Sequence, residues 1–174
     1  MGTLAQYMED DHNRIDGLLA RSVADPERFD HEAFERFRSA LLHHVGIEEK
    51  ILLADARRRG GGVPLPIAPV LRREHGAIAS LLVPTPDHAL VAEIRALLDV
   101  HNPREEGPDG LYATCERLAG PDVPALLARV RAAPEVPMAR HYDGSRATRS
   151  AADALARSSE AAPPRSFVPH SKPN

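Results

Sequence analysis

Apolar residues recur at intervals of three and four along four segments of the chain, the spacing that places side chains on one face of an α-helix. The four segments begin at Thr3, about Asp30, Ile67 and Pro86, and they end before Asp25, at Arg59, at Leu82 and at Glu106. Thr3 with Gln6, and Thr85 before Pro86, are typical helix-capping pairs. We therefore predict an all-α protein, an up-down antiparallel four-helix bundle.

The chain after the fourth segment has weaker patterns. Residues 107–110 break the helix, which resumes to about Ala119, and a short amphipathic helix is predicted over residues 124–133. We assign residues 1–133 to the bundle and residues 134–174 to a partly disordered tail rich in Ala, Ser, Arg and Pro. A short helix is expected within this tail, from Ser145 to Ala162, and disorder over the last dozen residues. Because the tail lacks apolar periodicity, its deletion is expected to leave the bundle intact.

The apolar stripes are interrupted by polar residues of metal-ligand type. His12 and His75 occupy core positions in the first and third segments, and the motif HxxxEE occurs once in the second and once in the fourth, from His44 and from His101. Residues four apart on a helix point the same way, so each motif presents a His and a Glu, Glu48 or Glu105, at one place. Burying such groups is costly unless they are paired or bound to something.

The six polar residues form a donor set that suits transition metals. Four imidazoles and two carboxylates are typical ligands of iron, manganese or zinc, and two bridging carboxylates imply two metal ions. If each metal takes two His, one oxygen from each Glu and a shared oxo or hydroxo group, an octahedral ion keeps one open position. The predicted ligands are His12, His44, Glu48, His75, His101 and Glu105.

This pattern, H…HxxxE…H…HxxxE over residues 4–119, resembles the hemerythrin-like (HHE cation-binding) family. The resemblance implies a bundle around two iron ions, oxo- or hydroxo-bridged, with the four His as terminal ligands and Glu48 and Glu105 as bridges. Dioxygen-carrying hemerythrins add a fifth His one turn after the third-helix ligand, where this chain has Ala79, and use Asp as the last bridge. The resemblance therefore implies open positions on both irons.

The implied function is binding or sensing of dioxygen, nitric oxide or peroxide. Two alternatives stay open, namely a di-iron oxidoreductase that decomposes peroxide or reduces nitric oxide, and an iron storage or donation protein. The implied partner is a small diatomic ligand or peroxide.

Several nearby residues have alternative interpretations. His43 could compete with His44 but falls off the apolar stripe, and Glu49 and Glu106 are expected either in solvent or behind the ligands. For Tyr112 we favour core packing over contact with the site, and Cys115 is expected to be a small buried residue. The remaining histidines are expected at the surface: His31, His88, His141 and His170.

Bulk properties limit the classes of partner. At 174 residues the chain fits one domain, and a formal net charge of −3 gives no argument for nucleic acid or an anionic membrane. The single cysteine excludes an internal disulfide framework and fits a reducing compartment. No secretory signal and no window of about eighteen apolar residues is visible, so we expect a cytoplasmic protein.

Overall fold

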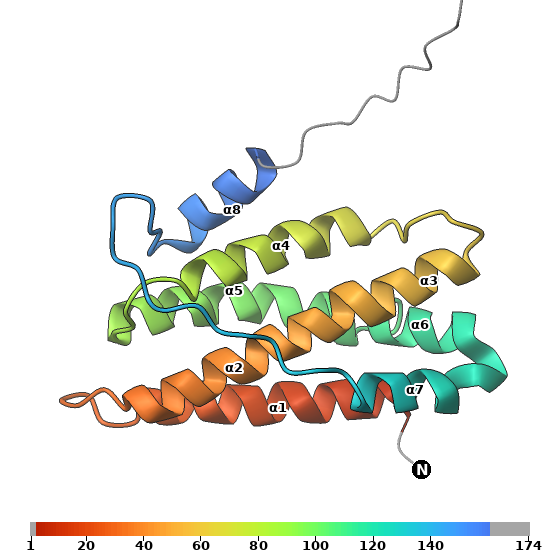
Figure 1. Ribbon diagram of the computed structural model, residues 1–174, viewed down its shortest axis with the longest axis horizontal. Helices are drawn as coiled ribbons and strands as arrows, with labels where there is room; N and C mark the ends of the chain where they lie inside the picture. Colours follow the sequence, from red (N-terminus) through yellow and green to blue (C-terminus); the bar gives the residue numbers. More distant parts are fainter. Residues whose placement is uncertain (1–2, 161–174) are drawn as a thin grey trace, which may run out of the picture.

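The computed structural model describes residues 3–160, and the regular elements among them are helices. The longer helices α1, α2, α4 and α5 lie side by side, α6 and α7 follow at one end, and α8 lies outside α4 (Figure 1). Their bounds are α1 Leu4–Ser22, α2 His31–Ile47, α3 Leu53–Arg59, α4 Ala68–Leu81, α5 His88–Glu106, α6 Leu111–Ala119, α7 Val123–Arg131 and α8 Ala151–Glu160. The predicted all-helical class is confirmed.

The helices α1, α2 and α5 each begin after a side-chain cap, and the cap of α5 differs from the predicted one. The Thr3 side chain accepts a hydrogen bond from the Gln6 N–H at 3.1 Å, as predicted for α1. The fourth helix begins later than predicted, because Asp87 accepts the N–H bond in the first turn of α5. The Thr85 hydroxyl donates instead to Asp143 at 2.6 Å, so its predicted role as cap is wrong.

The second predicted helix contains a change of helical type. Between α2 and α3 the chain forms a π-helical turn, Glu48–Leu52, without breaking the rod. Such turns insert one residue into the hydrogen-bond ladder and are frequent at functional sites. This turn begins at one of the predicted metal ligands.

The core consists of two apolar clusters with polar residues between them. The first contains, among others, Leu4, Met8, Ile47, Leu52, Leu71, Tyr112, Leu126 and Val130. The second contains, among others, Ile15, Leu19, Phe34, Phe37, Leu41, Ile78, Leu81, Leu90, Ile94 and Leu97. Along each long helix a predicted histidine ligand lies at the boundary of these clusters, for example His12 between Met8 and Ile15. A polar layer therefore crosses the middle of the bundle.

The segment after α7 contacts the bundle more closely than its composition predicts. Residues 134–150 contain no helix, and the Tyr142 N–H donates to the Val83 carbonyl at 3.0 Å. Helix α8 packs on α4, and Ala154 is fully buried in the second cluster. The short helix expected within the tail is observed as α8, and the last dozen residues, predicted to be disordered, lie outside the described residues.

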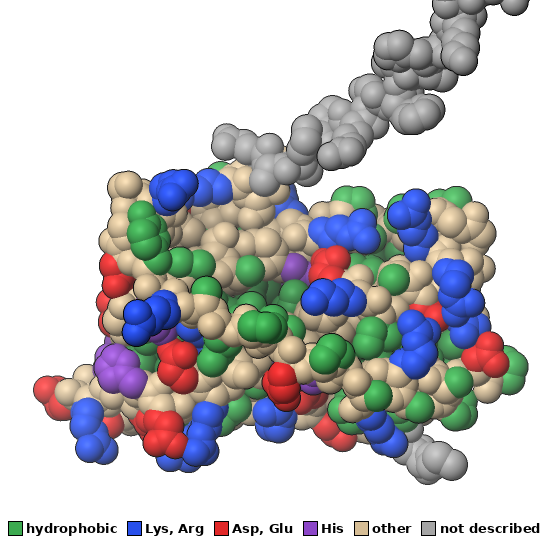
Figure 2. Space-filling view, in the orientation of Figure 1, with side chains coloured by type: hydrophobic (Ala, Val, Ile, Leu, Met, Phe, Trp, Pro, Cys, Tyr) green, Lys and Arg blue, Asp and Glu red, His purple; other side chains and the backbone are tan. Residues whose placement is uncertain are grey.

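Side chains of both charges are exposed at the molecular surface. On the face drawn in Figure 2, Lys and Arg side chains are interspersed with Asp and Glu. This distribution matches the near balance of the sequence, with a net charge of −3. Among the described helices, none combines the length and the apolar character needed to cross a membrane.

Candidate metal centre

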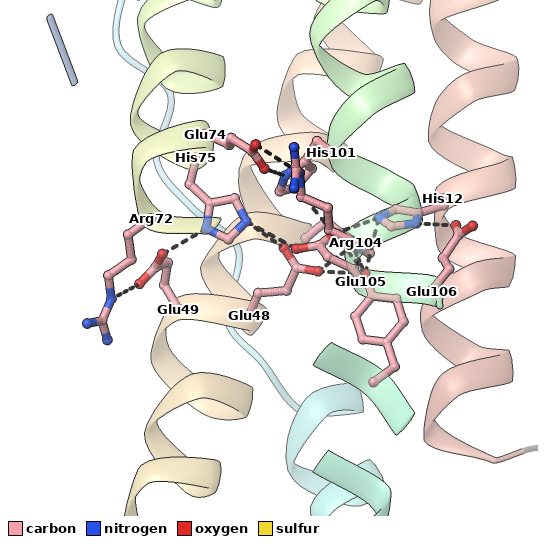
Figure 3. Close-up of polar contacts among 12 residues, drawn as sticks. His12, Glu48, Glu49, Arg72, Glu74, His75, His101, Arg104, Glu105 and Glu106 are labelled. Carbon is pink, nitrogen blue, oxygen red and sulfur yellow. Dashed lines mark hydrogen bonds and ion pairs between the residues drawn. The ribbon is translucent and has the colours of Figure 1, made fainter. Parts of the chain in front are cut away.

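The structure brings all six predicted ligands together in the polar layer. Each is at most 6 % exposed. They come from α1, α2, the π-helical turn, α4 and α5: His12, His44, Glu48, His75, His101 and Glu105. Their donor atoms form two groups, within each of which all atoms lie within 4.8 Å of one another. Figure 3 shows several of these side chains pointing into one volume between the helices.

The first donor group comprises His12, His44, Glu48 and Glu105. The Nε2 atom of His44 lies 3.1 Å from Glu48 Oε1, one helical turn away. The Nε2 atom of His12 lies 3.5 Å from Glu105 Oε2. Two imidazole Nε2 atoms and two carboxylates therefore face a common point.

The second donor group comprises Glu48, His75, His101 and Glu105. The Nε2 atom of His75 lies 3.2 Å from Glu48 Oε2 and 3.3 Å from Glu105 Oε1. The Nε2 atom of His101 lies 3.2 Å from Glu105 Oε2. Both carboxylates thus belong to both groups, and the two oxygens of Glu48 face different histidine pairs.

Pro103 lies inside the second HxxxE motif and does not disrupt it. Proline removes one backbone donor and usually kinks a helix. Helix α5 nevertheless continues to Glu106, and His101 and Glu105 stay on one face.

A second set of carboxylates holds the outer nitrogen of each imidazole. Each Nδ1 lies at hydrogen-bond distance from an Asp or Glu on a neighbouring helix or on the π-helical turn. The pairs are His12 with Glu106 at 2.6 Å, His44 with Asp11 at 2.8 Å, His75 with Glu49 at 2.7 Å, and His101 with Glu74 at 2.9 Å. With Nδ1 donating to these acids, Nε2 is left to face the centre, which is the usual way of fixing a metal-ligating imidazole.

Sequence reasoning anticipated only half of this set. Glu49 and Glu106 were expected either in solvent or behind the ligands, and the structure places both behind the ligands. Asp11 and Glu74 were not predicted. The sequence did contain a signal for them, because an acid directly precedes the first histidine in each copy of the repeat: Asp11 before His12, and Glu74 before His75.

Arginines lie on the outer side of three of these acids. Arg14 contacts Asp11 at 2.7 Å, Arg72 contacts Glu49 at 3.2 Å, and Arg104 contacts Glu74 at 3.1 Å. Burial alone would raise the pKa of Asp11, but hydrogen bonds with His44 and Arg14 outweigh it and lower that pKa. The same balance, through His75 and Arg72, lowers the pKa of Glu49.

Two of the four imidazoles, His44 and His75, are strongly basic in this structure. Burial would lower the pKa of His44, but the charge of Glu48 and hydrogen bonds with Asp11 and Glu48 raise it to about 10. Burial would also lower the pKa of His75. Hydrogen bonds with three carboxylates outweigh this effect and raise the pKa to about 12; the partners are Glu105, Glu48 and Glu49. The pKa of Glu48 is well below its ordinary value despite burial, because His44 and His75 stabilise its anion. The carboxylates thus require positive charge at the centre.

These residues fit a bound metal ion. The Oε2 atom of Glu48 is buried in the polar layer and makes no hydrogen bond of good geometry within the described part of the chain, although His75 Nε2 lies 3.2 Å away. Imidazole nitrogen with carboxylate oxygen is a donor set of iron, manganese and zinc. A cation would replace the imidazole protons as the compensating charge.

Tyr112 lies inside the site, contrary to the favoured prediction of core packing alone. Its hydroxyl donates to Glu48 Oε1 at 2.6 Å and lies 3.1 Å from the Nε2 atoms of both His12 and His44. Burial and the charges of Glu48 and Glu105 raise the pKa of this phenol well above its ordinary value.

The other candidates lie away from the donor groups. His43 contacts the Ala133 carbonyl at 3.2 Å, and Cys115 is buried with its pKa raised to about 12 by burial and by nearby carboxylates. Ala79 is exposed, so a side chain at this position faces solvent and not the metal site. His31 and His88 are outside the core, as predicted, and His141 pairs with Glu35. His170 lies outside the described residues.

Comparison with known proteins agrees with this geometry. No curated protein and no solved structure matches the chain. The family model described as the hemerythrin HHE cation binding domain matches residues 3–120, which contain all six clustered residues and Tyr112. The chain therefore belongs to the hemerythrin HHE cation-binding domain family.

Proposed function

We propose that this protein is a non-haem di-iron protein that binds or senses dioxygen, nitric oxide or peroxide. One iron is held by the first donor group and the other by the second, with Glu48 and Glu105 as bridges. The proposal includes the up-down antiparallel arrangement of the four long helices and a cytoplasmic location.

The sharing of both carboxylates carries this proposal. A single metal ion would need one group of donors, whereas this site has two groups joined by Glu48 and Glu105. The two oxygens of Glu48 face different histidine pairs, at 3.1 Å from His44 and 3.2 Å from His75. A carboxylate placed in this way is suited to bridge two ions.

The two apolar clusters support the antiparallel arrangement. The first cluster contains the beginning of α1 and of α4, together with Ile47 at the end of α2. The second contains the end of α1 and of α4, and earlier parts of α2 and α5. Neighbouring helices that run in opposite directions produce this alternation.

The enclosure of the site favours a very small ligand. Every clustered side chain is almost fully buried, and the apolar clusters lie on both sides of the layer. Bound iron would supply redox chemistry and open coordination positions, while the buried surroundings exclude larger molecules. Dioxygen, nitric oxide and peroxide satisfy this limit of size.

The test is to load the protein anaerobically with ferrous iron, measure iron per chain, and add nitric oxide, peroxide and air separately. We expect two irons per chain and a change of absorption spectrum with at least one ligand. Glu48→Ala and Glu105→Ala should each lose the paired centre, because either substitution removes a bridge. Asp99→Ala serves as the matched control, since Asp99 is an exposed acid on the same helix as Glu105.

Three results would contradict the proposal. One is a wild-type protein that holds a single iron, another is either bridge variant that keeps two, and the third is a loaded protein whose spectrum none of the ligands changes. Steady consumption of peroxide in large excess over iron would assign the protein to the di-iron oxidoreductases instead.

A further inference from the structure

The hydroxyl of Tyr112 lies beside the donor atoms of the first donor group. It lies 2.6 Å from Glu48 Oε1, 3.1 Å from both imidazole nitrogens, and 3.3 Å from Glu105 Oε2. All four donor atoms of the group are therefore direct neighbours of this one oxygen. Ordinary packing of a tyrosine against a polar layer would require one hydrogen bond, not contacts with the complete donor set.

We infer that Tyr112 is a fifth protein ligand of the metal in the first donor group, an inference that rests on the proposed di-iron function. An octahedral ion with bonds of about 2.1 Å has adjacent donor atoms about 3.0 Å apart and opposite ones about 4.2 Å apart. The Tyr112 oxygen is at the adjacent distance from all four other donors. Tyr112 would therefore be placed to hold a cation together with these four donors.

The local fold holds Tyr112 in this place. Gly110 precedes α6, and a Cβ atom there would lie 2.5 Å from the Glu105 carbonyl oxygen. The absence of a side chain allows the start of α6 to approach the end of α5 closely, next to Glu105. The Tyr112 ring is fully buried in the first apolar cluster, so the phenol has little freedom to leave the site.

Within residues 3–160, the second donor group has no residue equivalent to Tyr112. The separation of 57 residues that relates His44 to His101 and Glu48 to Glu105 relates Asp55 to Tyr112. Asp55 is buried, but it contacts Arg58, Arg59 and Arg129 instead of the metal site. Tyr112 therefore makes the two halves of the centre unequal.

Ligation by Tyr112 requires the exchange of one proton and no electrons. The O–H bond of the phenol breaks, a bond from its oxygen to the cation forms, and the proton leaves to solvent. The Glu48 Oε1 atom, which accepts the phenol hydrogen bond, is then available to the same cation. The first metal would have five protein donors and the second four, so an added small ligand should bind preferentially at the second metal.

The experiment uses the iron-loaded full-length chain, oxidised with ferricyanide. Phenolate bound to ferric iron gives a visible charge-transfer band, and excitation in this band enhances the Raman modes of the tyrosine ring. We expect wild type to show both, and Tyr112→Phe to retain iron while losing both. The double variant Tyr7→Phe/Tyr142→Phe leaves Tyr112 as the single tyrosine of the chain and should keep both signals.

The outcomes separate this inference from the proposed function. Two irons per wild-type chain without the band or the ring modes would overturn ligation by Tyr112 and leave the di-iron centre standing. A band that persists in Tyr112→Phe would also overturn it. If Tyr112→Phe fails to fold or to load iron, the double variant decides, since its ring modes can come only from Tyr112. A wild-type chain that does not bind two irons would contradict the proposed function itself.

Discussion

Removal of the metal should make the stability of this protein strongly dependent on pH. In the metal-free fold the imidazoles of His44 and His75 carry the positive charge that the buried carboxylates need. The pKa of His44 is raised from 6.5 to about 10, and that of His75 from 6.5 to about 12. We expect the free energy of unfolding of the metal-free protein to fall as the pH rises from about 7 to about 8.5.

The sign follows from where each group loses its proton. An imidazole whose pKa is higher in the fold stabilises the fold fully below its unfolded pKa of 6.5, and this contribution is lost as the pH rises toward the folded pKa. Within this window the free energy of unfolding falls by about 1.4 kcal/mol per pH unit for each such imidazole. Two imidazoles over about 1.5 pH units lose roughly 4 kcal/mol, a large part of the typical 5–15 kcal/mol of a domain. The pKa of His101 is also raised, which adds to the loss.

Urea unfolding followed by circular dichroism measures this difference. Metal-free protein would be compared with iron-loaded protein at about pH 7 and about pH 8.5. The iron-loaded protein should keep its free energy of unfolding at the higher pH, because the metal replaces the imidazole protons as the compensating charge. His31→Gln is the control variant, since His31 is exposed and away from the site. Equal stability of the metal-free wild type at the two pH values would refute protonated imidazoles as the compensating charge. The upper pH stays below 9.0, the ordinary pKa of the Cys115 thiol, above which its raised pKa in the fold would add a further loss of stability.

Four further substitutions test other parts of the structure. Asp11→Asn and Glu74→Gln should each weaken metal binding by about 10- to 100-fold in chelator competition, because each removes the carboxylate that holds the Nδ1 atom of one imidazole. Unchanged affinity would show that these acids do not orient the ligands. Ala79→His should leave iron content and the rate of air oxidation unchanged in stopped-flow measurements, because position 79 faces solvent, and an added metal-bound histidine would contradict the structure. Gly110→Ala should destabilise the fold by about 1–3 kcal/mol in urea unfolding through its clash with Glu105, and a neutral effect would show that α6 can move freely.

The clustering of the six polar residues could be predicted from sequence because two independent signals coincide at them. A polar residue on an apolar stripe is costly in isolation, and the occurrence of the same motif twice made a shared site the simplest explanation. The helix spacing of His44 and Glu48, and of His101 and Glu105, then predicted their common direction. The structure brings these residues together as predicted.

The features that sequence reasoning missed depend on contacts between distant segments. The site position of Tyr112 depends on the close approach of α6 to α5 at Gly110, which no periodicity encodes. The resemblance to dioxygen-carrying hemerythrins places Ala79 at the position of their fifth histidine, one helical turn after His75. Four residues along a helix leave about 40° of rotation, and the structure places Ala79 in solvent. The segment after α7 was expected to have little to bury, yet small residues such as Ala154 pack closely against α4.

The outer carboxylates close a ring around the bundle. Each acid holds the histidine of another helix. The pairs, in order around the bundle, are Asp11 of α1 with His44 of α2, Glu49 of the π-helical turn with His75 of α4, Glu74 of α4 with His101 of α5, and Glu106 of α5 with His12 of α1. Neither half of the chain can complete this ring alone, because His12 and His75 each depend on an acid from the other half. Two copies of one helix pair, related by a twofold axis, would satisfy each other in the same way. The single chain thus carries the internal symmetry of a homodimer of helical hairpins, and Tyr112 breaks that symmetry in the polar layer.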